Sequence, residues 1–135
     1  MTVLLDTHAW VWWMEGDNRL GRKTLVALDG LPENERPVIS DVSIWEIATL
    51  LGLGRWTCQI PFEIWLQKAT HARTVTVVPI TTPVGIELTR LPHSLHKDPA
   101  DRIIIATARV LKLPLLTRDR RILGSKLTRS WTPQA

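Results

Sequence analysis

The sequence predicts an α/β domain built around a central, mainly parallel sheet. Short apolar runs of strand length alternate with longer segments that carry helical periodicity or helix-capping residues. The segments between the runs are long enough to hold the crossover helices that parallel strands require. No repeat, linker or low-complexity segment divides the chain, so we expect one domain over residues 1–135.

The apolar runs predict the strands of this sheet. Each is short and bounded by turn residues, and the third is the richest in β-branched side chains. A run that is apolar at nearly every position suits a strand buried on both faces. The expected strands, in chain order, are residues 2–5, 37–39, 75–78 and 115–117, and residues 126–131 are a further candidate.

The segments between these runs predict helices. Gly52 ends one of them, and Pro61 and Pro99 suit the first turns of two others. The last long segment has the strongest helical pattern, with isoleucine and alanine residues along one face. The expected helices are residues 7–14, 20–28, 42–51, 61–73, 83–91 and 99–111, followed by a helical turn at 120–123.

Composition excludes several classes of protein. Apolar residues make up 44% and charged residues 22% of the 135 residues, which excludes a disordered chain. The single cysteine, Cys58, excludes an intramolecular disulfide framework and a cysteine-rich zinc site, and it suits a reducing compartment. No apolar run approaches the roughly 20 residues of a membrane span, and the apolar start lacks the pattern of a signal peptide. We therefore expect a cytoplasmic protein.

Basic residues concentrate in the last part of the chain. The formal net charge is +4, but residues 97–135 carry nine Lys or Arg against three acidic residues, a net of +6. A basic segment suits a polyanionic partner, most simply nucleic acid, although many solvated surfaces are basic as well.

Two aspartates follow predicted strands. Asp6 comes directly after the first strand, and Asp119 comes two residues after the strand 115–117. In a parallel sheet both would lie at the carboxyl edge, where ligands of open α/β folds bind. Aspartate is also a preferred N-cap, so capping and a functional role both stay open for these residues.

Glu46 is the carboxylate that local structure explains least. It lies within an apolar helical segment, and Arg55 is beyond the i+4 reach of a local ion pair. An ionised glutamate there either lies on the one solvent-exposed face of its helix or is partly buried and needs a partner. Ser43, one turn earlier, is small enough to leave space beside it.

The segment His-Lys-Asp-Pro-Ala-Asp-Arg, residues 96–102, begins the longest predicted helix. Asp98 before Pro99 is the expected pair of N-cap and first-turn proline, so we assign Asp98 no metal. Asp101 then takes the third helical position, where the helix dipole favours an acid. This end of the helix should lie near the sheet edge that carries the other two aspartates.

Convergence of Asp6, Glu46, Asp101 and Asp119 would require a compensating charge. Two carboxylates about 4 Å apart repel each other by roughly 4 kcal/mol at an effective dielectric constant of about 20. A hard divalent cation such as Mg²⁺ or Mn²⁺ prefers oxygen ligands and relieves the repulsion. Such an ion also activates water against a phosphodiester. The four acids are therefore a hypothetical metal centre.

Three stretches of the chain, with the spacing between them, resemble the PIN domain. They are LLDTHAWVWW at 4–13, SDVSIWEIATLLGLGR at 40–55 and HKDPADRIIIATARVLKLPLLTRD at 96–119. The greatest likeness is to the VapC-type toxins of toxin–antitoxin pairs, and it extends over nearly the whole chain.

The resemblance implies a three-layer α/β/α fold, a carboxylate cluster that binds Mg²⁺ or Mn²⁺, and ribonuclease activity. It also implies a small antitoxin protein in the active-site groove and a homodimer. The catalytic and metal-binding acids of the family fall on Asp6, Glu46, Asp101 and Asp119, the same four that the residues alone suggest. Thr117 is expected to orient the cluster through its hydroxyl, with Ser43 as a second supporting residue, although Thr117 is equally explained as an ordinary strand residue.

Basic and aromatic residues supply candidate contacts to partners. The arginines that flank the acids are candidates for phosphate contacts, with a solvated surface role as the alternative for each: Arg102, Arg118, Arg120 and Arg121. Core packing is the expected role of most tryptophans. One helix can hardly bury all three of Trp10, Trp12 and Trp13, however, so these are candidates for contact with an antitoxin, unpaired RNA bases or a second copy.

We predict from the sequence a metal-dependent endoribonuclease that cleaves RNA with metal-activated water. The four histidines show no paired metal spacing, so a zinc site is not expected. One alternative is a non-catalytic module of the same fold that binds RNA or an antitoxin. Another is an aspartate phosphotransfer domain with Asp6 as phosphoacceptor, which the sequence disfavours because no second acid follows two residues later.

Overall fold

Four parallel strands form the centre of the protein, as the sequence predicts. The computed structural model describes residues 2–133, so Met1 and residues 134–135, which the single predicted domain includes, lie outside the described residues. The strand order is β3-β2-β1-β4, and every neighbouring pair is parallel. The strands are β1 (Leu4–Leu5), β2 (Val38–Ser40), β3 (Thr76–Val78) and β4 (Leu115–Leu116).

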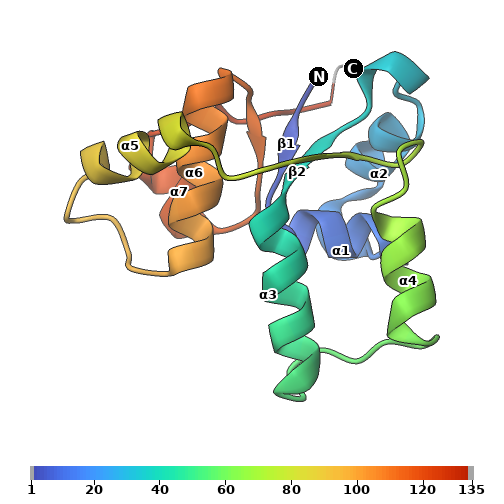
Figure 1. Cartoon of the computed structure of the whole chain (residues 1–135). Coiled ribbons are helices and arrows are strands. Elements are labelled where there is room, and N and C mark those ends of the chain that lie inside the picture. Colours follow the sequence, from blue (N-terminus) through green and yellow to red (C-terminus); the bar gives the residue numbers. More distant parts are fainter. Residues whose placement is uncertain (1, 134–135) are drawn as a thin grey trace.

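Helices cover both faces of this sheet and give the expected three-layer α/β/α arrangement (Figure 1). Helices α1, α2 and α4 lie on one side, and α5, α6 and α7 lie on the other. The helices are α1 (Thr7–Glu15), α2 (Arg22–Asp29), α3 (Asp41–Gly52), α4 (Phe62–Ala69), α5 (Thr82–Arg90), α6 (Pro99–Leu111) and α7 (Arg120–Ser125), with 3₁₀ turns at Asn18–Leu20 and Glu33–Glu35. Within residues 2–133, none of these helices combines the length and apolar character that crossing a membrane requires.

Alternation along the strands explains why each apolar run is continuous. In β1, Leu5 packs into the core beneath α1 and α2, whereas Leu4 packs against α6 on the opposite face. Ile39 and Val38 divide in the same way in β2. A strand covered on both faces has no solvent side, so its sequence lacks polar positions.

The structure corrects three predicted boundaries. The helix predicted at 20–28 begins at Arg22, because Gly21 at φ 93° separates it from a 3₁₀ turn that Asp17 caps. The helix predicted at 61–73 ends at Ala69. The candidate strand at 126–131 is reduced to one parallel bridge between Ser130 and Leu115.

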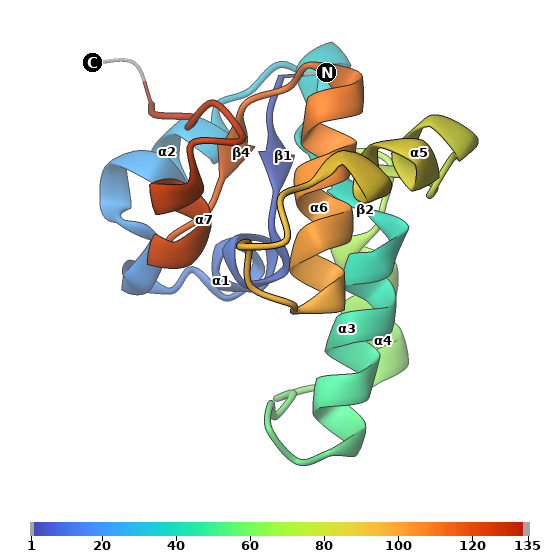
Figure 2. The same ribbon diagram turned by 90° about the vertical axis from the view of Figure 1, so that its left-hand side faces the viewer.

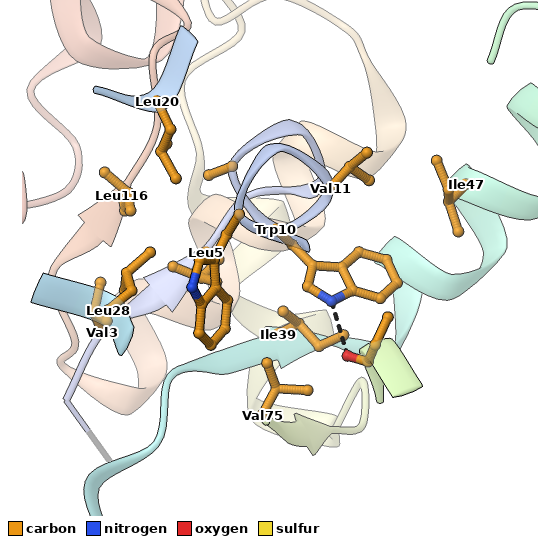
Figure 3. Close-up of a cluster of buried hydrophobic side chains, with 13 residues drawn as sticks. Val3, Leu5, Trp10, Val11, Leu20, Leu28, Ile39, Ile47, Val75 and Leu116 are labelled. Atoms are coloured by element: carbon orange, nitrogen blue, oxygen red, sulfur yellow. Dashed lines mark hydrogen bonds between the residues drawn. The ribbon is translucent and has the colours of Figure 1, made fainter. Parts of the chain in front are cut away.

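The prediction that Trp10 and Trp13 contact a partner is wrong, because both are core residues. Trp10 is 0% exposed, and its indole N–H donates to the carbonyl of Ala69 across 3.0 Å, which joins α1 to the end of α4 (Figure 3). Trp13 is 7% exposed and donates to Asp29 across 2.9 Å. Each indole thus has its polar atom satisfied inside the protein, which is how tryptophan is tolerated in a core.

The carboxyl edge of the sheet gathers the starts of several helices. Helices α1, α3 and α7 directly follow β1, β2 and β4, so they begin at this edge. Helix α6 leads to the amino end of β4 from the same edge, and it packs against α3 (Figure 2). Beyond this edge, α3 and α4 project from the body of the protein, joined by the segment 53–61 (Figure 1).

We expect Trp10→Phe to lower the free energy of unfolding by about 1–3 kcal/mol, because the buried Ala69 carbonyl loses its donor. Trp45→Phe is the matched control, since Trp45 is 58% exposed and its replacement should change stability by no more than about 0.5 kcal/mol. Urea unfolding followed by circular dichroism measures both. Equal stability of the two variants would contradict the structural role of the Trp10 hydrogen bond.

Candidate metal centre

The four predicted acids all lie at the carboxyl edge, on four different elements. Asp6 follows β1, Asp119 follows β4, Glu46 lies on α3, and Asp101 lies in the first turn of α6. The topology brings them to one edge because parallel strands end together and α6 begins where they end.

Asp6 is the most buried of these acids, with 4% of its surface exposed. It caps α1 by accepting the N–H of Ala9 across 2.7 Å, and its other carboxylate oxygen accepts a hydrogen bond from the hydroxyl of Thr117. Burial raises the pKa of Asp6 above its ordinary value, although both hydrogen bonds favour the ionised form. Capping and a place in the acid cluster are therefore compatible in the same residue.

Thr117 links two of the acids. Its hydroxyl donates to Asp6 and accepts the backbone N–H of Asp119 across 3.0 Å. Asp119 in turn caps α7. Its carboxylate accepts a hydrogen bond from the guanidinium of Arg121 across 3.0 Å, and this hydrogen bond lowers the pKa of the carboxyl. Thr117 therefore sits where the resemblance placed a supporting hydroxyl.

Asp101 is held at both its backbone and its side chain. Its N–H donates to Asp98 across 3.0 Å, which confirms Asp98 as the N-cap of α6. Its carboxylate lies 2.9 Å from Nε2 of His96 and 3.9 Å from the guanidinium of Arg121. Burial is the main cause that raises the pKa of Asp101, and neighbouring negative charge adds to it.

One carboxylate oxygen of Glu46 lacks a partner. The residue is half-buried, and its Oε1 has no hydrogen-bond partner among the residues that the structure describes. Burial raises the pKa of Glu46 and the charges of Asp98 and Asp101 raise it further, while the nearby hydroxyl of Thr7 lowers it. Ser43, predicted as a supporting residue, contacts the hydroxyl of Thr7 at 2.9 Å.

These groups fit a hard divalent cation. The donor set is made of carboxylate oxygens. Three of the four acids have raised pKa values, and a nearby cation would lower them because it stabilises the ionised form. The unpartnered Oε1 of Glu46 is a buried acceptor that such a cation would satisfy.

His96 is the site residue that sequence reasoning missed. One ligand atom each of His96, Asp101 and Asp119 lie within 4.8 Å of one another. From the sequence, we expected no histidine metal site because no two histidines have the spacing of a metal-binding pair on one helix. His96 lies in the loop before α6, where helical spacing does not apply. The available signal was its position, two residues before the N-cap Asp98 and five before Asp101.

Comparison with known proteins identifies the family of the chain. A sequence model of the PIN domain matches residues 3–124. The chain belongs to the PIN domain family. It is 36% identical to Ribonuclease VapC22 of Mycobacterium tuberculosis over 122 residues, which cover 90% of this chain and 89% of that relative.

Solved structures share the fold of this PIN domain at low sequence identity. VapBC2 from Rickettsia felis, bound to a DNA fragment from their promoter, superposes with a TM-score of 0.73 at 15% identity, over 97% of this chain and 98% of that one. A toxin–antitoxin complex from Klebsiella pneumoniae gives 0.66 at 21% identity, over 98% of both chains. These likenesses bear on the fold alone.

The four candidate arginines of this PIN domain have different surroundings. Arg102 donates to the carbonyls of Leu95 and His96, and Arg118 donates to Leu20 and Thr24, so both bind the protein itself. Arg121 pairs with two of the acids, and Arg120 is exposed on the first turn of α7.

Trp12 is the one candidate tryptophan that is not in the core. It is half-buried, the guanidinium of Arg19 lies 4.9 Å from its ring centroid, and the ring of His8 lies 5.8 Å away. Contact of Trp12 with a partner stays a prediction.

Without divalent cations, the stability of this PIN domain should fall as the pH rises above the ordinary carboxyl range of about 4. Carboxyls with raised pKa values keep protons in the folded state that the unfolded chain has already released, so unfolding becomes easier as pH rises. Glu46→Gln should make this decline shallower. Thermal unfolding in EDTA from pH 5 to pH 8 measures the slope.

Glu63→Gln on the exposed part of α4 is the matched control and should keep the wild-type slope. A Glu46→Gln profile parallel to wild type would contradict the assignment of a raised pKa to Glu46.

Proposed function

We propose that this protein is a metal-dependent endoribonuclease whose metal ligands are Asp6, Glu46, Asp101 and Asp119. The observation that carries the proposal is the gathering of these acids at the carboxyl edge, with Glu46 Oε1 buried and unpartnered among the described residues. The similarity to a relative named as a ribonuclease supports RNA as the substrate.

The chemistry divides between the ion and the protein. When bound, Mg²⁺ or Mn²⁺ supplies an activated water and stabilises charge on the phosphodiester. Asp6 is fixed for binding by the Ala9 N–H and the Thr117 hydroxyl, and Thr117 keeps Asp119 beside it. No side chain forms a covalent intermediate in this scheme.

Charge favours RNA around the site. The four proposed ligands account for four of the 13 acidic residues, so a bound cation leaves a surface dominated by the 17 basic ones. Arg120 and Arg121 extend from the first turn of α7 beside Asp119, and we assign them to substrate phosphates. Arg102 and Arg118 each donate two hydrogen bonds to the protein itself and are weaker candidates for the same role.

We also propose that the protein is the toxin of a toxin–antitoxin pair and acts in the cytoplasm. The solved structures of similar fold include such complexes. Large apolar side chains are exposed on the projecting α3 and α4 and the segment between them, namely Trp45, Leu53, Ile60 and Ile64. An exposed apolar surface of this kind suits a protein partner such as an antitoxin.

Self-association into a homodimer is a separate part of the proposal. Two further large apolar side chains are exposed, Ile80 just before α5 and Ile86 in the middle of this helix, at 46% and 48%. Light scattering coupled to size exclusion tests the dimer.

Purified protein should cleave single-stranded RNA with Mg²⁺ or Mn²⁺ and stop with EDTA. Asp6→Asn and Asp101→Asn should each reduce cleavage at least about 100-fold, because each loses a charged ligand. Asp98→Asn is the matched control, since asparagine caps a helix as well as aspartate, and it should cleave at nearly the wild-type rate. Cleavage is measured on labelled RNA, with folding checked by circular dichroism.

Undiminished cleavage by both ligand variants would contradict the mechanism. Metal binding without cleavage of any RNA would favour the alternative, a non-catalytic module that binds RNA or an antitoxin.

A further inference from the structure

We propose that His96 is a positioning residue of the metal centre: it binds one carboxylate oxygen of Asp101 and leaves the other oxygen for the divalent cation. The inference rests on the metal site of the proposed function. It adds to that site a residue outside the four acids.

The His96 ring is buried against the cluster, and its backbone is restrained. Its side chain is 12% exposed, and Nε2 lies 2.9 Å from Oδ2 of Asp101. The guanidinium of Arg102 donates to the carbonyls of Leu95 and His96 at 3.3 and 3.5 Å, and the side chain of Leu95 is buried beside α6. These contacts restrain the backbone at Leu95 and at His96 itself, which keeps the ring beside Asp101.

The chemistry of this contact makes His96 a donor. In the ionised state that metal binding requires, the Asp101 carboxylate only accepts hydrogen bonds, so Nε2 then carries the proton of this hydrogen bond. A protonated ring nitrogen has no lone pair for a metal, so the nitrogen within reach of the cluster cannot be a ligand while this bond exists. Nδ1, the other ring nitrogen, is buried and has no hydrogen-bond partner in the described part of the chain.

Fold stability alone does not explain why the His96 ring is buried here. A buried ring with one nitrogen unpartnered costs free energy, and its one side-chain hydrogen bond ends on an acid of the cluster. Asp101 is meanwhile fixed at its backbone by Asp98, and among the described residues His96 supplies the one hydrogen bond to its carboxylate, beside the longer ion pair with Arg121 at 3.9 Å. Residues that orient metal ligands in this way typically change metal affinity by about 10–100-fold when they are removed.

The test measures Mn²⁺ affinity by isothermal titration calorimetry, independently of RNA cleavage. His96→Ala should weaken Mn²⁺ binding by about 10–100-fold, whereas His96→Gln, whose amide N–H can donate to Asp101, should remain within about threefold of wild type. His93→Ala is the matched control from the same loop, exposed and outside the cluster, and it should bind as wild type does.

A second measurement on the unmodified protein covers the case in which a variant does not fold. In ¹H–¹⁵N spectra of the His96 ring, Nε2 should keep the chemical shift of a protonated nitrogen when Mg²⁺ is added. Loss of that proton would make His96 a direct ligand and overturn the proposal.

Wild-type Mn²⁺ affinity in a folded His96→Ala variant would also overturn it, as would His96→Gln binding as weakly as His96→Ala. If the wild type binds Mn²⁺ and His96→Ala does not, but no RNA is cleaved, the ribonuclease proposal fails and the role of His96 stands.

Discussion

Burial of carboxyl groups at one edge of the sheet is the constraint on which the rest of this structure depends. Asp6, Glu46 and Asp101 are all removed from bulk water, and burial is the largest cause of the raised pKa of each. Such groups must be protonated, hydrogen-bonded or paired with a cation. The protein supplies neutral donors to Asp6 and a histidine to Asp101, but it leaves one oxygen of Glu46 unpartnered among the described residues. A divalent cation is the group that would complete this arrangement.

The supports of the cluster form a chain of contacts through distant parts of the sequence. Thr117 joins the end of β1 to the start of α7, and the loop before α6 places His96 on Asp101. The guanidinium of Arg121 lies 3.0 Å from Asp119 and 3.9 Å from Asp101, so an exposed arginine of the protein already offsets part of the charge of these two acids. In the proposed function, Arg121, which lies on the surface, would exchange these carboxylates for a substrate phosphate once a metal takes over their charge.

Most of the fold, and the position of the four acids at the carboxyl edge of the sheet, could be predicted from the sequence, whereas their role as metal ligands stays a proposal. Strands buried on both faces produce continuous apolar runs, and a carboxylate at the end of such a run marks the carboxyl edge. Glu46 stood out because its helix offers no local cation. These are properties of neighbouring residues, which a sequence displays directly.

The remaining features depend on how the chain folds back on itself. His96 reaches Asp101 through an irregular loop, and Trp10 is buried because the end of α4 offers the carbonyl of Ala69. From the sequence, we expected that one buried face of α1 could not hold all of its tryptophans. In the structure, the sheet, α2 and α4 together cover α1. Only Trp12 is left at the boundary with solvent.

The most direct test of the metal centre is a crystal structure of the protein soaked with Mn²⁺, with anomalous diffraction measured at the manganese edge. We expect an anomalous peak among the carboxylates of Asp6, Glu46, Asp101 and Asp119, with His96 still bound to Asp101. Absence of a peak at millimolar Mn²⁺, with Arg121 still between Asp101 and Asp119, would contradict it.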